Sequence, residues 1–461
     1  MNRLRATVAE VRAALEAEGF TLEELPNQPG ILRVLDGPRS VSDTWGHWAG
    51  DFYIQQASTA VAVGLLDPQP GERVLDLCAA PGGKTTHIAE AMQGEGEIVA
   101  VEVNDGRIRA LLGNIYRLGI TNIAVAEGDG RTLPTEAQFD RVLADVPCSA
   151  QGTWRKKAGH LPPRHRNFIK QTTRAQESLL RRAIELTRPG GVILYVTCTF
   201  DPAENEAVVS RVLADPPRPI DIEPIELAIP HVRGVTEYDG QSFDPRLDGA
   251  VRLYPHHLDS GGLFICRIRR LEAGDGEASG GEAVSAAGTG VAAGWSAPPE
   301  ADPAIVSRAL DVLESHYGVD PTRFEGLHWF ERGDALWVHG FEEWPIDNWS
   351  PGRHWRLITL GLRAADLGGD GPPRPTNDLL QYLDSAITRN RLELDAQQWC
   401  DLFDGREVRI DDIERGHVAL AFDGHVAGWG FVRDHRLQHH IPRGRSQWLR
   451  NVVAGRAGTE G

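Results

Sequence analysis

The sequence predicts an α/β protein built on a doubly wound, mostly parallel β-sheet, followed by a smaller α+β module. Short apolar segments alternate with helical segments between residues 73 and 196, as they do in doubly wound sheets. A glycine-rich turn follows the first apolar segment, at the position where such sheets bind ligands. Residues 271–307 contain no Lys or Arg and are dense in Gly, Ala, Ser and Glu, which is typical of a flexible linker.

The predicted elements follow one another in the order that such a sheet requires. Leu4, Val8, Val11 and Leu15 recur at three- and four-residue spacing, so a helix is expected near the N-terminus. A Pro-Gly-Gly segment at 189–191 ends the longest of the later helices. The predicted strands are 73–77, 97–101, 123–126, 141–144 and 192–196, the predicted helices between them are 84–92, 105–118 and 171–186, and 251–254 and 262–268 are expected to form a late antiparallel edge.

The segment after the linker is rich in tryptophan and then changes to one helix and short strands. The helix is predicted over 377–388, and the strands over 407–410, 417–422 and 426–432, with Gly424 in a hairpin turn. We therefore divide the chain into four parts. They are an N-terminal helical extension (1–50), the sheet domain (51–270), a flexible linker (271–304) and a C-terminal α+β region (305–461).

Composition excludes several classes of protein. The five cysteines are scattered and form no CxxC pair, so neither a disulfide framework nor a metal site is expected. No signal peptide opens the chain, and no apolar run of about 18 residues could span a bilayer. We expect a cytoplasmic protein. Because no heptad seam or long apolar edge is present, we also expect a monomer.

The net charge of −17 argues against non-specific binding of nucleic acid over the whole surface, but two segments are basic. Residues 151–182 carry nine basic side chains against the single acid Glu177. Residues 433–450 carry five arginines against Asp434. Such stripes can hold the phosphates of a nucleic acid in a salt-dependent way, or they can be solvated helix faces, and the sequence leaves both open.

The glycine-rich turn and two acids indicate a ligand that carries a nucleoside. Small residues and glycines let backbone amides approach a ligand closely. Glu102 ends the second predicted strand, where it could accept both hydroxyls of a ribose, and Asp129 follows the third, where it could contact adenine. Each acid alone could be a turn or cap residue, but together they favour a cofactor. The turn consists of Cys78, Ala79, Ala80, Pro81, Gly82, Gly83 and Lys84.

Five segments between about residues 39 and 270 can be compared with known families. They are Phe52–Gln56, Asp76–Thr85, Asp145–Ser149, Gly152–Lys156 and Thr197–Glu206. Together they resemble the Sun/Fmu family of RNA cytosine-carbon-5 methyltransferases. Two segments beyond the linker, Gly428–Gly430 and His439–Gly444, resemble the C-terminal RNA-binding module of the RsmF type. The chain departs from the family in Val146, where alanine is usual, and in a shortened N-terminal region.

The resemblance implies a Rossmann-like class I methyltransferase domain with a PUA-like C-terminal module. It implies S-adenosyl-L-methionine as the cofactor, held by the turn with Glu102, Asp129 and Asp145, and RNA as the partner. The RsmF type acts on small-subunit ribosomal RNA, and transfer RNA is an alternative. A non-catalytic RNA-binding assembly factor is another, but such a protein is expected to lose Cys198 or the turn, and neither is lost.

Two cysteines suit this chemistry, because carbon 5 of cytosine accepts a methyl group only after a thiolate has added at carbon 6. The resemblance implies that Cys198 is the nucleophile, that Cys148 assists release, and that Asp145 binds the base edge. Lys84 could contact the base or the catalytic loop. Cytosine methyltransferases that act on DNA carry the nucleophile in a Pro-Cys motif, which would instead assign the attack to Cys148. A buried Cys198 with only a packing role is the remaining alternative.

The target base must leave its stack to reach a buried thiolate, so phosphates beside it are expected to be held. The basic residues that follow the Cys148 loop are the first candidates, and the C-terminal module supplies a second set together with Trp448. The predicted RNA contacts are Arg155, Lys156, Lys157 and Arg164 in the first set, and Arg443 and Arg445 in the second. Cys266 and Cys400 are expected to be structural.

Overall fold

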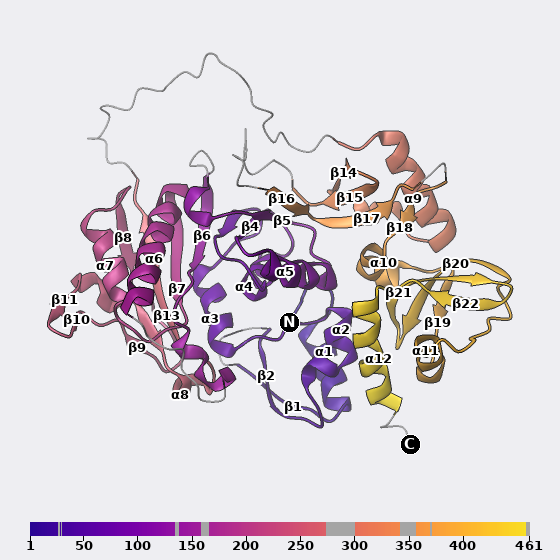
Figure 1. Ribbon diagram of the computed structural model, residues 1–461, viewed down its shortest axis with the longest axis horizontal. Coiled ribbons are helices and arrows are strands. Elements are labelled where there is room, and N and C mark those ends of the chain that lie inside the picture. Colours follow the sequence, from indigo (N-terminus) through magenta and orange to yellow (C-terminus); the bar gives the residue numbers. More distant parts are fainter. Residues whose placement is uncertain are drawn as a thin grey trace, which may run out of the picture.

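The computed structural model describes residues 1–25, 28, 30–133, 138–157, 166–272, 300–341, 356–368 and 371–457. Figure 1 shows a central sheet with helices on both faces. Most of the strand-rich C-terminal region lies to the right of this sheet. The N-terminal helix α2 (Trp45–Ala49) contacts the last helix of the chain and one C-terminal strand, and α1 (Val8–Ala17) precedes it at the N-terminal end. In the part of the chain so described, no helix has both the length and the apolar character needed to cross a membrane.

The central sheet is doubly wound, as predicted. Its strands run in the order β16-β5-β4-β3-β6-β7-β13-β12-β9, with β8 paired to β13. The five strands from β5 to β7 are parallel, and β16, β13 and β12 are antiparallel to their neighbours. The strands are β3 (Arg73–Asp76), β4 (Glu97–Glu102), β5 (Ile123–Glu127), β6 (Phe139–Asp145), β7 (Thr187–Thr197), β8 (Ile220–Glu223), β9 (Val232–Arg233), β12 (Val251–Leu253), β13 (Leu263–Arg270) and β16 (Arg356–Leu360).

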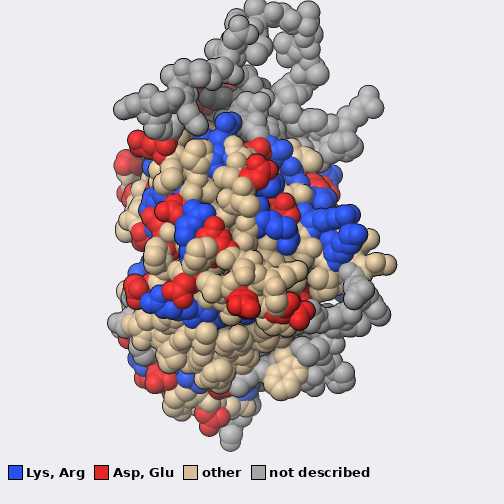
Figure 2. All heavy atoms as spheres, turned by 90° about the vertical axis from the view of Figure 1, so that its left-hand side faces the viewer, with Lys and Arg blue, Asp and Glu red and all other residues tan. Residues whose placement is uncertain are grey.

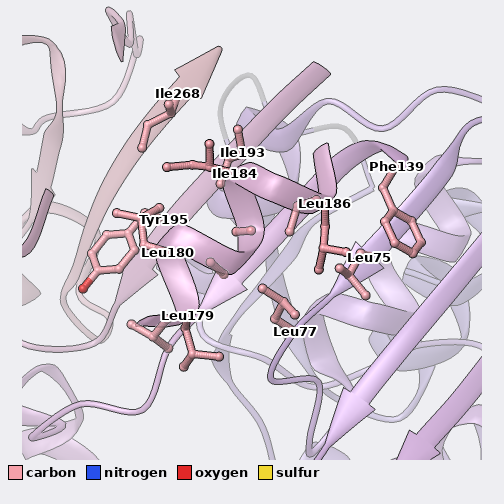
Figure 3. Packing of buried hydrophobic residues seen from close by; sticks show 14 of the residues in the cluster. Leu75, Leu77, Phe139, Leu179, Leu180, Ile184, Leu186, Ile193, Tyr195 and Ile268 are labelled. Atoms are coloured by element: carbon pink, nitrogen blue, oxygen red, sulfur yellow. The ribbon is translucent and has the colours of Figure 1, made fainter. Parts of the chain in front are cut away.

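Both faces of the sheet are buried, because successive strand residues point to opposite sides and are apolar on each. Leu75 packs with α6 and α7, and Figure 3 shows side chains of α6 pointing at it and its neighbours. Val74, the residue before it, packs on the other face with α3, α4 and α5. The covering helices are α3 (Ala57–Leu66), α4 (Gly83–Ala91), α5 (Asp105–Leu118), α6 (Arg166–Leu186) and α7 (Glu206–Ala214).

Local signals placed most of these elements correctly. The predicted helix over 105–118 is confirmed, because the Asn104 side chain caps its first turn and Gly119, at φ +67°, ends it. Helix α6 begins earlier than predicted, at Arg166. The antiparallel edge predicted from 251–254 and 262–268 is confirmed, since β13 pairs with β7 and β12 follows β13 toward that end of the sheet. The short strand β9 extends the same edge by one more antiparallel pairing.

The C-terminal region is an α+β structure with two four-stranded sheets among its described residues. The predicted strand over 407–410 was wrong, because this segment makes only one isolated bridge, between Arg409 and Arg436. The first sheet holds β14 (His328–Arg332), β15 (Ala335–His339), β17 (Leu362–Asp366) and β18 (Arg374–Pro375), and the second holds β19 (Arg391–Glu393), β20 (Arg415–Phe422), β21 (His425–Arg433) and β22 (Arg436–His439).

The remaining elements are short or connect these layers. Helix α9 begins at Pro303, inside the segment predicted as a linker, while residues 273–299 of that linker lie outside the described residues. The other C-terminal helices are α9 (Pro303–Tyr317), α10 (Asn377–Leu383), α11 (Ala396–Phe403) and α12 (Arg443–Ala457). Short elements elsewhere are β1 (Thr21–Glu24), β2 (Leu32–Asp36), β10 (Glu237–Tyr238), β11 (Gln241–Ser242) and α8 (Pro255–Leu258).

The C-terminal region also joins the rest of the molecule in two ways that the sequence did not suggest. Strand β16 adds to the central sheet by pairing with β5, and the Tyr116 hydroxyl donates to Thr359 Oγ1 at 3.0 Å. On the other side, Trp45 and Trp48 of α2 are buried in one apolar cluster with Trp399 of the C-terminal region. The four-part division stays a prediction, but apolar cores cross its boundaries.

Candidate active site

The two predicted catalytic cysteines lie side by side at the carboxyl edge of the sheet. Cys148 follows β6 and Cys198 follows β7, and these strands are parallel neighbours whose ends pair at Asp145 and Val196. The two Sγ atoms are 3.2 Å apart, and the backbone N–H of Cys198 donates to Cys148 Sγ at 3.3 Å. Both side chains are half-buried. The strand order therefore brings together two thiols that are 50 residues apart.

The two thiols are not equivalent. A hydrogen bond from Cys148 lowers the pKa of Cys198, and the positive charge of Lys84 lowers it further, against the opposing effects of burial and Asp145. The same contact with Cys198, together with burial, raises the pKa of Cys148 well above its ordinary value. The contact between the two thiols and the charge of Lys84 therefore favour the thiolate at Cys198.

A half-buried ion pair lies beside the cysteines. Lys84 Nζ, in the first turn of α4, is 2.6 Å from Asp145 Oδ2, in the last residue of β6. Burial alone would lower the pKa of Lys84, but the charge and hydrogen bond of Asp145 outweigh it, so that the pKa is raised. Lys84 thus stays protonated and places a positive charge close to the Cys198 thiolate.

The glycine-rich turn is held by an acid beneath it. Asp76 accepts hydrogen bonds from Thr85 Oγ1 at 2.7 Å and from the Cys78 backbone at 3.3 Å, and burial raises its pKa to about 6. Gly82 has φ +106°, and a Cβ there would lie 2.9 Å from Leu111 Cδ1, so the turn needs a glycine at this position. Burial raises the pKa of Cys78 well above its ordinary value, which keeps this thiol out of nucleophilic chemistry.

The residues present at the turn fit a cofactor with a ribose. Glu102 accepts hydrogen bonds from the Val103 and Asn104 backbone at 3.0 Å through one oxygen. Its other oxygen, Oε2, is buried and, among the described residues, accepts no hydrogen bond, although Arg107 lies 3.1 Å away. A buried carboxylate oxygen without a donor suits a ribose hydroxyl.

Asp129 is the third acid predicted to hold the cofactor. It caps the short helix η2 (Gly130–Thr132) and forms an ion pair with Arg131, which lowers the pKa of Asp129. The capping role considered in the sequence is therefore present. The carboxylate lies beyond the end of β5, on the same edge of the sheet as Glu102, and a third of its side chain is exposed.

Sequence reasoning missed the buried carboxylate that supports the Cys148 loop. Glu204, which has no exposed surface, accepts hydrogen bonds from the backbone of Ser149 at 2.9 Å, from the Ser149 hydroxyl at 2.5 Å and from Gln176 Nε2 at 3.2 Å. Gln176 Nε2 also donates to the Pro147 carbonyl at 2.9 Å. The loop that carries Cys148 is thus tied to a charge buried inside the protein.

The neighbouring Asn205 supports the Cys198 loop in the same way. Its Oδ1 accepts from the Thr197 hydroxyl at 2.5 Å, and its Nδ2 donates to the Thr199 carbonyl at 3.0 Å. The sequence indicated this acidic segment only as part of the Thr197–Glu206 motif. The burial of Glu204 and Asn205 could not be predicted from the sequence, because it results from packing against distant segments and not from a local pattern.

The predicted RNA contacts are placed unevenly. Arg155, Lys156 and Lys157 belong to the short helix η3 (Gln151–Lys157), directly after the Cys148 loop, but their side chains and the whole of Arg164 lie outside the described residues. The Gly152 N–H in this helix donates to the Cys198 carbonyl at 2.8 Å. The segment that follows Cys148 is therefore hydrogen-bonded to the loop that carries Cys198.

The rest of the first basic segment is largely paired with acids. Arg181 contacts Glu177 at 3.4 Å and Asp215 at 3.6 Å, and Arg182 contacts Glu185 at 2.9 Å. On the face that Figure 2 shows, basic and acidic side chains alternate. Arg181 and Arg182 are therefore bound in ion pairs, while RNA binding by the rest of this segment stays a prediction.

The second set of predicted contacts lies in α12. Arg443 is exposed at its first residue. Arg445 is half-buried and contacts Asp378 at 2.5 Å and Gln381 Oε1 at 3.2 Å. Trp448 donates from Nε1 to the Ser42 carbonyl at 3.3 Å, so it joins the C-terminal region to the N-terminal extension and is not a free RNA-binding ring.

Known proteins are similar to this chain in sequence and in fold. A family model described as 16S rRNA methyltransferase RsmB/F matches residues 63–269. The chain is 32% identical over 455 residues to the ribosomal RNA small subunit methyltransferase F of Klebsiella pneumoniae (strain 342). The aligned residues make up 96% of this chain and 88% of that protein. The chain belongs to the RsmF family. It is an RNA (cytosine-5)-methyltransferase that uses S-adenosyl-L-methionine.

Two further matches cover the sheet domain. The 28S rRNA (cytosine-C(5))-methyltransferase of Mus musculus is 33% identical over 277 residues, which are 59% of this chain and 34% of that protein. The crystal structure of a methyltransferase homolog from Pyrococcus horikoshii is 31% identical, with a TM-score of 0.53, and covers 59% of this chain and 85% of that chain. These matches confirm the Rossmann-like methyltransferase fold predicted from the sequence.

Proposed function

We propose that this RsmF-family enzyme methylates carbon 5 of a cytosine in small-subunit ribosomal RNA through a covalent bond between Cys198 and the base. The observation that carries the mechanism is the 3.2 Å contact between the two thiols, which lowers the pKa of Cys198. The similarity to a small-subunit enzyme along 96% of the chain supports the substrate.

The chemistry begins at the Cys198 thiolate. It adds to carbon 6 of the cytosine, and the electron pair displaced from the 5,6 double bond makes carbon 5 nucleophilic. Bound S-adenosyl-L-methionine would supply the electrophilic methyl group, held by the Cys78–Lys84 turn with Glu102, Asp129 and Asp145. Asp145, whose carboxylate is fixed by Lys84, binds the polar edge of the base and stabilises the ring as it gains charge.

Release restores the double bond. Once carbon 5 carries the methyl group, its proton leaves, and the bond between Cys198 Sγ and carbon 6 breaks. Cys148 is the group positioned to take this proton. Its pKa is raised by the hydrogen bond and the charge of Cys198 as well as by burial, and the charge disappears when Cys198 is bonded to the base. Addition at Cys198 therefore lowers the pKa of Cys148, which can release its own proton to solvent and, as a thiolate, accept the proton from carbon 5.

A covalent-adduct experiment separates the two cysteines. Cys148→Ala, mixed with cofactor and a small-subunit ribosomal RNA transcript, is expected to accumulate a protein–RNA adduct that survives denaturing electrophoresis. Cys198→Ala is expected to form none and to lose at least about 10³-fold in turnover. Cys400→Ala, a half-buried cysteine of the C-terminal region, is the matched control and should behave as wild type. An adduct with Cys198→Ala and none with Cys148→Ala would reverse the roles.

The substrate is tested in cells. Bisulfite mapping of total RNA from a deletion strain should show one or more cytosines in small-subunit ribosomal RNA that lose their methyl group. Loss confined to transfer RNA would contradict the proposal and favour the alternative substrate. We further propose a cytoplasmic monomer, for which light scattering of the purified protein should give the mass of one chain, 50.5 kDa.

A further inference from the structure

The two cysteines at the carboxyl edge of the sheet can react with each other as well as with the base. In the proposed mechanism Cys198 adds to carbon 6 and Cys148 takes the proton from carbon 5, and neither role needs a bond between the two sulfur atoms. Their Sγ atoms nevertheless lie 3.2 Å apart, in direct contact. A disulfide bond has a length of about 2.05 Å, so the two sulfur atoms are within about 1.2 Å of bonding distance.

The surrounding structure keeps the two sulfur atoms together. Cys148 and Cys198 follow neighbouring parallel strands, and the backbone N–H of Cys198 donates to Cys148 Sγ at 3.3 Å. The Glu204 carboxylate accepts from the backbone of Ser149, the residue after Cys148, at 2.9 Å. The Gly152 N–H donates to the Cys198 carbonyl at 2.8 Å and so ties the two loops to each other. The two thiols therefore meet without any change in the sheet.

Cys198 is the member of the pair that an oxidant attacks first. Its hydrogen bond with Cys148 lowers the pKa of Cys198, and the charge of Lys84 lowers it further, against burial and Asp145. The thiolate is the form of cysteine that reacts with peroxides. Both cysteine side chains are half-buried and not sealed in the core, so they are open to a molecule as small as hydrogen peroxide.

The other three cysteines are placed differently. Burial raises the pKa of Cys78 well above its ordinary value, and it raises the pKa of Cys266 as well, so both stay protonated and unreactive. Cys400 is half-buried and packs against the apolar cluster of the C-terminal region. Cys148 is therefore the thiol positioned to react with an oxidised Cys198.

We propose that Cys148 and Cys198 are a site of reversible oxidation, at which a peroxide converts the two thiols into a disulfide bond and switches methylation off. The loss of activity rests on the proposed function, whereas formation of the disulfide does not. Because the bond occupies both sulfur atoms, Cys198 can no longer add to the base and Cys148 can no longer take a proton. The bond also stops oxidation of Cys198 before the sulfinic acid, which thiols do not reduce.

The chemistry needs one peroxide and both thiols. The Cys198 thiolate attacks an oxygen of hydrogen peroxide, the O–O bond breaks, and Cys198 becomes a sulfenic acid as hydroxide leaves. The sulfur of Cys148 then attacks the sulfenic sulfur, so that the S–S bond forms and the S–O bond breaks, and the second hydroxide takes the proton of Cys148. In sum, the thiols lose two electrons and two protons, and the peroxide becomes two molecules of water. A small dithiol reverses the bond by exchange.

Oxidation of the purified full-length protein tests the site. After hydrogen peroxide, peptide mass spectrometry without reductant should find Cys148 joined to Cys198, and the intact mass should be lower by two hydrogen atoms. We expect methylation to fall at least about tenfold and to return almost completely after dithiothreitol. Cys400→Ala is the matched control and should form the same bond and lose activity at the same rate. Thermal unfolding should show that the oxidised protein stays folded.

The variant Cys148→Ala shows whether Cys148 protects Cys198. With excess peroxide, Cys198 should pass to the sulfinic acid, and the capacity of this variant to form the RNA adduct should stay lost after dithiothreitol. A wild-type protein that carries sulfinic acid at Cys198 and no disulfide, or that keeps full activity as the disulfide, would overturn the inference. If the disulfide forms but unoxidised Cys148→Ala makes no adduct, the proposed function fails while the oxidation site stands.

Discussion

The cysteine edge of the sheet and the C-terminal region are built in contrasting ways. At the cysteine edge, Asp145, Cys148 and Cys198 follow the ends of two neighbouring parallel strands, so pairing of the strands is enough to bring them together. In the C-terminal region, the core is completed by tryptophans more than 300 residues earlier in the chain. Trp45 stacks on Trp48 at 5.0 Å and meets Phe422 edge-on at 5.1 Å.

The difference shows which function-bearing parts depend on distant packing. The cysteines keep their spacing as long as β6 and β7 pair, and Glu204 and Asn205 refine the two loops. The C-terminal region depends on α2 on one side and on the β5 edge on the other. Its truncation would expose both surfaces, so RNA binding by this region is better measured with substitutions in the full chain.

The largest expected effect comes from removing Trp48. This side chain is 2% exposed, and Trp48→Ala leaves a cavity in a core shared by the two ends of the chain. We expect the free energy of unfolding to fall by about 3–5 kcal/mol, measured by denaturant unfolding. Trp154→Ala, at a tryptophan that is 46% exposed, is the control for the loss of an indole and should change stability much less. Equal losses of unfolding free energy in the two variants would show that the shared core stabilises the protein no more than an exposed indole does.

Replacing Lys84 tests the electrostatics of the cysteine edge. Lys84→Met keeps the length of the side chain but removes the charge that lowers the pKa of Cys198. Since that pKa rises, the acidic limb of the profile of kcat/KM against pH should move to higher pH, with turnover at pH 7 down about 100-fold. Lys170→Met, which removes an exposed charge from α6, should leave the profile in place. An unmoved limb in Lys84→Met would contradict the assigned role.

Glu204→Gln tests whether the buried carboxylate positions the Cys148 loop. The amide keeps one acceptor but presents its NH₂ group to the donors of Ser149 and Gln176. We expect turnover to fall about tenfold while the cofactor affinity and the pH of the acidic limb stay as in wild type. Single-turnover rates at several pH values measure the turnover and the acidic limb, and a titration measures the cofactor affinity. Glu177→Gln, at an acid on the outer face of α6, is the control and should be neutral.

The smallest effect is the pH dependence of an ion pair inside the C-terminal region, which lies close to the charges of Arg5 and Asp51. His425 Nδ1 is 2.8 Å from Asp384, and this contact raises the pKa of His425 above 6.5, with help from Asp51 and against Arg5. The stabilisation is complete below pH 6.5 and is lost as the pH rises through the folded-state pKa. Because His425 is partly exposed, we expect less than about 1 kcal/mol between pH 6 and pH 9. His425→Gln should unfold with a flatter dependence on pH.

Much of the catalytic edge could be predicted from the sequence because its signals are local. Cys78–Lys84 and Pro147-Cys148 each follow a strand directly. Segments in this position lie at the carboxyl edge of a parallel sheet. The inequality of the two thiols could not be predicted, because it depends on a 3.2 Å contact and on Lys84 reaching Asp145.

By itself, the sequence determined the doubly wound sheet, the order of its strands and helices along the chain, and the residue types at the edge that carries the cysteines. The reason is that apolar strands alternating with helices bury both faces of a sheet most efficiently in a doubly wound fold. Only the tertiary structure decided which of the two thiols has its pKa lowered, which arginines are bound in ion pairs, and where the C-terminal region docks. Those outcomes depend on distances of a few ångströms between distant segments, where burial and neighbouring charges compete and no local pattern records the result.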